Sequence, residues 1–285
     1  MKHILSGAVM GAAMALYAVA PAAAGPAPAD LRALGDVLQM DKTLAIMQRE
    51  ASQNAQEIAP DLFGGAAPAQ WGAAITALFD PATARAEFDK GLALGAANLS
   101  GAHLSEVMAF FQSPLGQRIV SLEITTREAL LDENIEAAAQ DVWADMQASP
   151  LPAQTQRAGL LQDIVTANDL IETNIAAALN GNFAFYQGLI DAGAAGGISA
   201  DDMLADVWAA EPQVRADMQD WLFPFLAMAY APLSDEDLQT YITFSQTAAG
   251  RALNGALFAA FDALGAVQSR GMGLAAGRLM AGQDI

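Results

Sequence analysis

The chain contains no cysteine, and this absence excludes several kinds of chemistry. Without thiols it can form no disulfide bond, offer no cysteine nucleophile and bind no metal through thiolates. Only two histidines occur among its 285 residues, His3 and His103, so a histidine-rich metal site is excluded as well. Burial of an apolar core must therefore stabilise the fold without covalent help.

Basic residues are also scarce. The chain has 13 lysines and arginines against 32 aspartates and glutamates, which gives a formal net charge of −19. A surface of this sign repels the phosphates of nucleic acids and of anionic lipids. We therefore expect no nucleic-acid partner and no electrostatic binding to membranes.

Long hydrophobic runs are missing except at the N-terminus. There, Lys2 and His3 precede an apolar stretch, Ile4 to Val19, that is followed by small residues up to Ala24. The stretch is shorter than the ~20 residues of a membrane-spanning helix. A basic head, an apolar middle and small residues before a cleavage point are typical of a signal peptide. We expect residues 1–24 to be removed and the mature, soluble protein to be exported to the periplasm.

The period-two alternation that marks β-strands is absent too. Alanine dominates the mature chain together with leucine, glutamine, glutamate and methionine, which are good helix formers. Apolar residues recur three and four apart, as in Leu31, Leu34 and Leu38. This spacing predicts an all-α fold.

Two segments of the chain resemble each other, Leu99–Arg118 and Leu233–Arg251. They align without gaps at a constant offset of 134 residues. The matched pairs are Ser100/Ser234, Leu104/Leu238, Phe110/Phe244, Gln112/Gln246, Ser113/Thr247 and Gly116/Gly250. Caps, an aromatic residue and a glycine in one register indicate an internal repeat.

The Pro-rich stretch Ser149–Pro152 is the best boundary between two halves. We predict a first helical repeat unit at residues 25–148, a linker at 149–156 and a second helical repeat unit at 157–285. The two related multi-helix units would pack as a duplicated helical bundle.

In each predicted unit, a hydroxyl residue caps a helix that begins after almost no loop. Ser113 and Thr247 are these caps, and Gly116 and Gly250 lie in the first turn that follows. Glycine costs stability inside a helix. Its presence at both places predicts that another backbone approaches closely there.

The pattern Leu-Ser-x-x-x-Leu-x-x-x-x-x-Phe-x-x-Ser-Pro-x-Gly-Gln resembles the signature of DUF2059, a family of exported proteobacterial proteins of unknown function. Leu99–Arg118 matches it closely, whereas the second copy has Ser245 where an aromatic is common and Ala248 where proline is usual. We predict two copies of this domain. The resemblance implies a helical fold and export, and it brings no catalytic residues.

His103 is the only histidine outside the predicted leader, so serine–histidine–acid catalysis would have to use it. It stands near the start of the helix that Ser100 is expected to cap. In the second copy its place is taken by Asp237. A polar residue at a helix start accounts for both, and we predict no catalytic role for His103.

Acidic residues form three clusters that could hold a hard cation or act as paired acids on a glycan. These clusters are Asp132-Glu133 with Glu136, Asp201-Asp202, and Asp235-Glu236-Asp237. The last two stand at predicted helix starts, where carboxylates favour the helix dipole. The first is interpreted as a solvated helix face. We therefore predict no catalytic, cofactor-binding or metal-binding residues and no cofactor.

Three functions remain open. The first is a non-catalytic interaction or assembly module with a protein partner. This function is preferred, so we expect that the chain is not an enzyme. The second is a carrier of an apolar ligand in the groove between the repeats, and the third is a carboxylate-based glycan-acting enzyme. Aromatic residues could line such a groove, although core packing explains them more simply. These are Trp71, Phe79, Phe88, Phe183, Phe185, Tyr186, Trp208, Trp221, Phe223 and Phe225.

Overall fold

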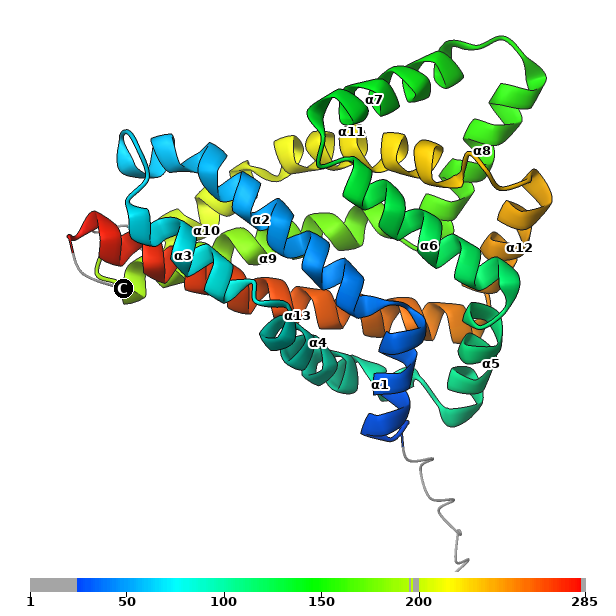
Figure 1. Ribbon diagram of the computed structural model, residues 1–285, viewed down its shortest axis with the longest axis horizontal. Helices are drawn as coiled ribbons and strands as arrows, with labels where there is room; N and C mark the ends of the chain where they lie inside the picture. The colour runs from blue at the N-terminus through cyan, green and yellow to red at the C-terminus, as the bar shows by residue number, and fades with distance from the viewer. Residues whose placement is uncertain (1–24, 195, 197–199, 283–285) are drawn as a thin grey trace, which may run out of the picture.

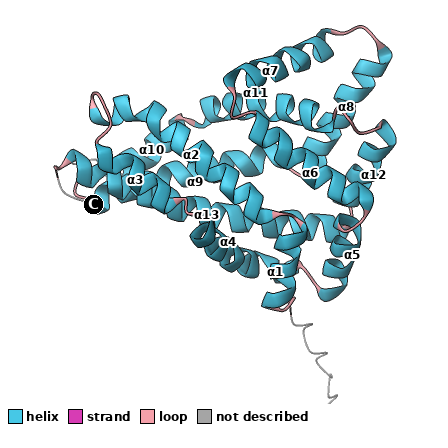
Figure 2. Ribbon diagram, in the orientation of Figure 1, coloured by secondary structure: helices cyan, strands magenta, loops and turns pink. Residues whose placement is uncertain are grey.

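The computed structural model describes residues 25–194, 196 and 200–282, and the regular structure of this part of the chain is entirely helical (Figures 1 and 2). The prediction of an all-α fold is confirmed. The predicted signal peptide, residues 1–24, lies outside the described residues. Within the part of the chain that is described, none of the helices has the length and apolar character needed to cross a bilayer.

We describe the helices in two series, called the first and second units and divided at the non-helical residues 149–151. The first unit, residues 25–148, contains α1 (Pro28–Val37), α2 (Met40–Phe63), α3 (Ala69–Leu78), α4 (Pro81–Gly95), the 3-10 turn η1 (Ala96–Asn98), α5 (Gly101–Phe111), α6 (Pro114–Ala129) and α7 (Glu133–Ala148). The second unit, residues 152–282, contains α8 (Pro152–Ala167), α9 (Leu170–Asp191), α10 (Ala200–Ala209), α11 (Glu211–Tyr230), α12 (Asp235–Ser245) and α13 (Ala248–Met280).

The stretch 149–156 was expected to be a linker, but only residues 149–151 are non-helical. Helix α8 begins at Pro152, which occupies its first position. Proline is accepted there because its missing N–H would have no partner in the helix anyway.

The two series share features of backbone conformation and helix boundaries. The short break between the first two helices of each unit contains a residue in the left-handed region, Gln39 with φ 53° and Asp169 with φ 50°. Helices α5 and α12 begin and end at positions 134 apart. The largest difference comes last, because α6 and α7 are separate helices whereas α13 runs unbroken for 33 residues.

The predicted helix caps are present at both corners. The hydroxyl of Ser113 accepts a hydrogen bond of 3.1 Å from the backbone N–H of Gly116. At the other corner, Thr247 accepts one of 2.9 Å from Gly250. Ser100 and Ser234 cap the preceding helices in the same way.

The predicted close backbone contacts at the two glycines are also present. A Cβ atom on Gly116 would lie 2.2 Å from the carbonyl oxygen of Phe110, and one on Gly250 would lie 2.3 Å from that of Phe244. The approaching backbone is the end of the preceding helix. Glycine therefore allows two consecutive helices to meet at a corner with almost no loop.

Two equivalent residues of the two corners touch each other. The rings of Phe110 and Phe244 stack with centroids 4.0 Å apart and an interplanar angle of 6°. Phe111 also packs edge-on to Phe244, with ring centroids 5.6 Å apart. The two corners therefore lie directly against each other in the fold.

Helices of one unit pack against helices of the other. Helix α4 of the first unit packs along α13 of the second, and α11 of the second packs on α6 and α7 of the first. Both large clusters of buried apolar residues accordingly combine the two units. One cluster joins Leu92 and Leu99 to Leu253 and Leu264, and the other joins Ile119 to Leu161. The two units thus share their cores.

Helix α13 runs along the length of the molecule (Figure 1), with α9 and α4 packed against it. Small residues bring these helices unusually close. A Cβ atom on Gly91 of α4 would lie 2.9 Å from the Cα of Ala260, and one on Gly188 of α9 would lie 2.1 Å from the carbonyl oxygen of Arg270. Any side chain at these glycines would push the helices apart.

The corner contacts predict the effect of adding one methyl group. Gly116→Ala and Gly250→Ala should each lower the free energy of unfolding by about 1–3 kcal/mol, because the new Cβ overlaps a carbonyl oxygen. Gly255→Ala is the matched control, since it lies in α13 with no atom within 4 Å of the new Cβ. It should stabilise the protein by about 0.5–1 kcal/mol.

Urea unfolding of the three variants measures these changes. If both corner variants were as stable as the parent protein, the close backbone approach described here would be wrong.

Candidate functional site: an apolar cavity with one carboxyl between the two units

A cavity of about 230 Å³ lies where α6 of the first unit meets the helices of the second. Most of its lining is apolar, and its polar groups are one carboxyl, two phenols and two amides. The lining residues are Glu123, Ile164, Asn168, Leu170, Leu222, Phe225, Leu226, Tyr230, Tyr241, Asn254, Leu257, Phe258 and Phe261.

Glu123 is the only charged residue in this lining, and α6 carries it into the cavity. The hydroxyl of Tyr230 donates a hydrogen bond of 2.5 Å to its Oε1 atom. Desolvation by burial raises the pKa of Glu123 to about 7, although the hydrogen bond from Tyr230 acts in the opposite direction. The side chain of Glu123 is half-buried, and its carboxyl holds a proton more tightly than an ordinary glutamate does.

Two tyrosines border the carboxyl. Tyr230 is 2% exposed, and burial together with the charge of Glu123 raises its pKa well above the ordinary value. Tyr241 stands edge-on to Tyr230 with ring centroids 6.2 Å apart, and burial raises its pKa as well. Tyr241 also stacks on Phe110, which places the cavity beside the Phe110/Phe244 pair.

Two amides form the other polar group of the cavity. The side chain of Asn254, on α13, donates a hydrogen bond to the side-chain oxygen of Asn168. Asn168 in turn donates a hydrogen bond of 2.9 Å to the carbonyl oxygen of Ile164 at the end of α8. These bonds hold both amides in place at the wall.

Comparison of the two units shows that these polar groups are specific to this place. At the offset of 134, the apolar residues Leu257, Ala96 and Val107 are the counterparts of Glu123, Tyr230 and Tyr241. The register is secure because the hydrogen bond from Leu99 N to Ala96 O recurs from Leu233 N to Tyr230 O, at 2.9 and 2.8 Å. The corner itself therefore does not require a carboxyl or a phenol.

The same comparison explains why the cavity is open. Gly91 lets α4 lie directly on α13, whereas its counterpart on α11 is Phe225, a cavity-lining residue. Facing helix α6 is bulkier as well, because Leu122 stands where α13 has Ala256. Helix α11 cannot approach α6 as closely as α4 approaches α13, and space remains between them.

Sequence analysis did not single out Glu123, Tyr230 or Tyr241. The available signal was the mismatch of polar against apolar residues in the 134-residue register. Of the aromatic residues that were considered as groove-lining, the structure places Phe225 in this cavity. Trp71 and Phe88 are instead fully buried in the core, as the packing interpretation expects.

His103 lies at a helix start away from the cavity. Its backbone N–H donates to the hydroxyl of Ser100, and its ring Nδ1 is 3.2 Å from the carbonyl oxygen of Asn98. The hydroxyl of the nearby Ser105 donates to the carbonyl oxygen of Gly101. These contacts with the local backbone are those of a polar helix start.

The acidic clusters also occupy helix starts. Asp132 caps α7 and accepts a hydrogen bond from the backbone of Asn134, which lowers the pKa of this carboxyl. Asp201 and Asp202 lie in the first turn of α10. Asp235 forms an ion pair of 2.8 Å with Arg157, and Asp237 completes a capping box with Ser234.

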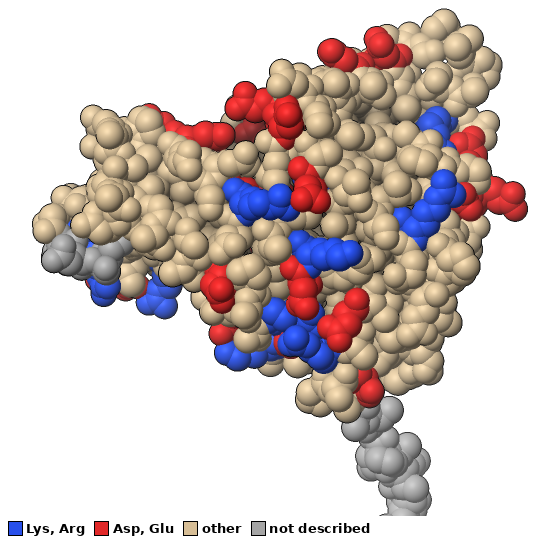
Figure 3. Space-filling model, viewed as in Figure 1, with Lys and Arg blue, Asp and Glu red and all other residues tan. Residues whose placement is uncertain are grey.

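Glu133 and Glu136 line an open groove of about 570 Å³, together with Glu50 and Glu57 of α2 and with Trp221. Figure 3 shows acidic atoms gathered where α2, α7 and α11 approach one another. Among the described residues, no group of histidines and carboxylates is close enough to hold a metal ion.

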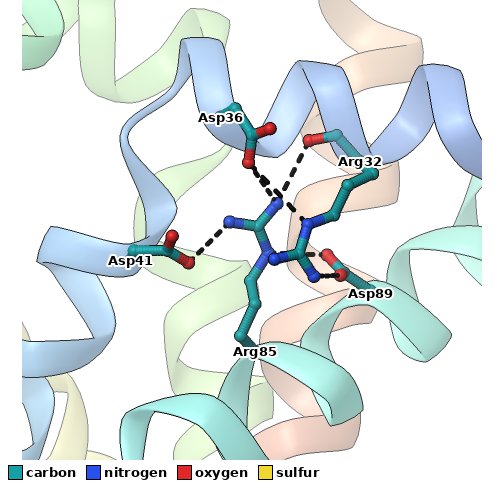
Figure 4. Close-up of polar contacts among 5 residues, drawn as sticks. All are labelled: Arg32, Asp36, Asp41, Arg85 and Asp89. Carbon is teal, nitrogen blue, oxygen red and sulfur yellow. Dashed lines mark hydrogen bonds and ion pairs between the residues drawn. The ribbon is translucent and has the colours of Figure 1, made fainter.

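A buried arginine forms the strongest ionic cluster, shown in Figure 4. Arg85 is 3% exposed and donates hydrogen bonds of 2.7–2.8 Å to Asp36, Asp41 and Asp89. Burial alone would lower its pKa, but the bonds to the three carboxylates outweigh this effect and raise it. The cluster joins α1, α2 and α4, so its role is to hold helices together.

Comparison with known proteins gives one match. A family model described as "Uncharacterized protein conserved in bacteria (DUF2059)" matches residues 96–145, from η1 to α7. The sequence resemblance predicted two copies, and this match covers one of them. No curated protein and no solved structure matches the chain.

The raised pKa of Glu123 predicts how stability depends on pH. Since the folded protein binds this proton more tightly than the unfolded chain, the stabilisation it provides is complete below about pH 4.5 and is lost as the pH rises through about 7. The free energy of unfolding of the parent, relative to Glu123→Gln, should fall over this range by at most about 3 kcal/mol. Hydration of the carboxyl by water in the cavity makes this fall in the free energy of unfolding smaller.

Urea unfolding at pH 4.5, 6, 7 and 8 measures the difference between the two proteins. Glu128→Gln is the matched control, since Glu128 lies on the same helix but is 54% exposed and pairs with Arg49. A difference between parent and Glu123→Gln that stays constant across this range would show that Glu123 is hydrated.

Proposed function

We propose that the protein is a non-catalytic binding protein, and that its ligand is a small, mainly apolar molecule held in the cavity between the two units. The observation that carries this proposal is the cavity itself, with apolar walls and a few convergent polar groups. Such a combination is typical of small-molecule sites in proteins. The groups come from both units, which agrees with the idea of a carrier whose ligand lies between repeats.

The size of the cavity limits the ligand. Its volume of about 230 Å³ is below the roughly 300–1,000 Å³ of sites for drug-sized molecules. A long lipid chain would not fit. The aromatic side chains of Phe225, Phe258 and Phe261 favour a compact ring or a short branched chain.

The polar groups of the cavity favour binding over catalysis. Glycoside cleavage needs two carboxyl groups about 5–9.5 Å apart, and this cavity has one. Two acids of the open groove already have other roles. Glu50 forms an ion pair of 2.7 Å with Arg127, and Glu133 stands in the first turn of α7.

Export and duplication belong to the proposal as well. The basic head, apolar stretch and small residues up to Ala24 support export to the periplasm with removal of residues 1–24. The matched bounds of α5 and α12 and the matched corners support an internal repeat.

A protein-interaction role is the second candidate. Leu204 and Trp208 stand four residues apart on α10 and are 46% and 62% exposed. Exposed apolar residues that share one helix face are a common feature of protein-binding surfaces.

The binding proposal is tested with two small aromatic probes of similar shape, benzyl alcohol and benzylamine. Isothermal titration calorimetry should show saturable binding of at least one of them to the purified protein. Leu257→Phe adds bulk to the cavity wall and should weaken that binding at least about tenfold, which corresponds to about 1.4 kcal/mol.

Leu94→Phe is the matched control, since Leu94 is 81% exposed on α4, and it should leave binding unchanged. The proposal fails if the parent binds neither probe, or if Leu257→Phe binds as tightly as the parent.

A further inference from the structure

One oxygen of the cavity carboxyl has no partner. The hydroxyl of Tyr230 bonds to Oε1 of Glu123, and no residue in the described part of the chain donates a hydrogen bond to Oε2. Every fully buried side-chain nitrogen or oxygen of the described residues does have a partner. Oε2 is therefore not fully buried, in agreement with the half-buried state of Glu123, and this residue lines the cavity.

The cavity also has no counter-charge for this carboxylate. The other polar residues of the lining are Tyr230 on α11, Tyr241 on α12, Asn168 at the end of α8 and Asn254 on α13. No lysine, arginine or histidine is among the lining residues. Glu123 is thus the group there that changes charge near neutral pH, and its ionised form is left without a cation.

We propose that the cavity selects a small organic cation, namely a protonated primary amine on a compact apolar body, whose ammonium group pairs with Glu123. This inference rests on the proposed binding function and names the class of its ligand.

An ammonium group supplies the counter-charge that is missing from the cavity lining. A carboxylate in apolar surroundings is costly unless it is paired, and it otherwise takes up a proton. The ammonium replaces that proton and brings three N–H donors for Oε2 and nearby oxygen acceptors. The aromatic rings of the wall add attraction for a cation.

Other ligand charges fit less well. An anionic ligand would meet no cation in the lining and would be repelled by Glu123. A neutral ligand would leave the carboxylate without a counter-charge. The net charge of −19 further raises the concentration of cations near the protein surface.

The test compares the affinities of benzylamine and benzyl alcohol, two probes that differ mainly in charge. At pH 8, calorimetry should show benzylamine bound at least about tenfold more tightly than benzyl alcohol. At pH 5.5, where a proton competes for Glu123, the advantage of the amine should shrink. Benzoate should not bind at either pH.

Two variants separate the cavity carboxyl from the general negative charge of the protein. Glu123→Gln should abolish the preference for benzylamine over benzyl alcohol. Glu128→Gln removes one surface carboxyl from the same helix and should keep the preference.

The outcomes separate a failure of the cationic-ligand proposal from a failure of the proposed binding function. Equal affinity for both probes, or a preference that survives Glu123→Gln, would overturn the assignment of a cationic ligand and leave the binding function standing. Absence of binding by either probe would overturn both.

Discussion

Direct contact between the backbone of α13 and its neighbours is the constraint on which the rest of the structure depends. Gly273 of α13 faces Phe185 of α9 so closely that a Cβ atom would lie 2.0 Å from its carbonyl oxygen. Farther along α13, a Cβ atom on Gly95 of α4 would lie 2.9 Å from the carbonyl oxygen of Ala256. Helix α13 thus packs against α9 of its own unit and against α4 of the other unit. Because α13 packs against helices of both, the two large clusters of buried apolar residues combine side chains of the two units.

The two units differ most where this close packing ends. The first unit has two helices, α6 and α7, in place of one continuous helix, and its partner α11 carries Phe225 and Tyr230 where α4 and η1 have Gly91 and Ala96. The contact between α4 and α13 is therefore tightly packed, whereas the cavity lies where α11 meets α6. Glu123, Tyr230 and Tyr241 occur at the cavity, where a carboxyl and phenols can be accommodated without displacing a neighbouring backbone.

Local features of the fold could be predicted from the sequence because they depend on residues close together in the chain. Ser113 before proline and Gly116 three residues later are enough to predict a cap and a tight helix corner, and the structure confirms both. The packing of helices of one unit against helices of the other could not be predicted, since it depends on which of several small-residue faces meet. Arg85 gave only the weak signal of an acid four residues later, Asp89, and its partners Asp36 and Asp41 come from other helices. In the sequence, Glu123 cannot be told from an acid on a helix surface, because its partner Tyr230 is distant in the chain.

The account requires that Glu123 be a carboxyl held in largely apolar surroundings, and its titration measures this most directly. In carbon-13 NMR of the intact protein, the side-chain carboxyl signal that disappears in Glu123→Gln identifies the residue. Its chemical shift should follow a titration with a midpoint near pH 7, because burial disfavours the charged form. A midpoint near the ordinary glutamate value of 4.5 would show a hydrated carboxyl and would contradict the account of the cavity.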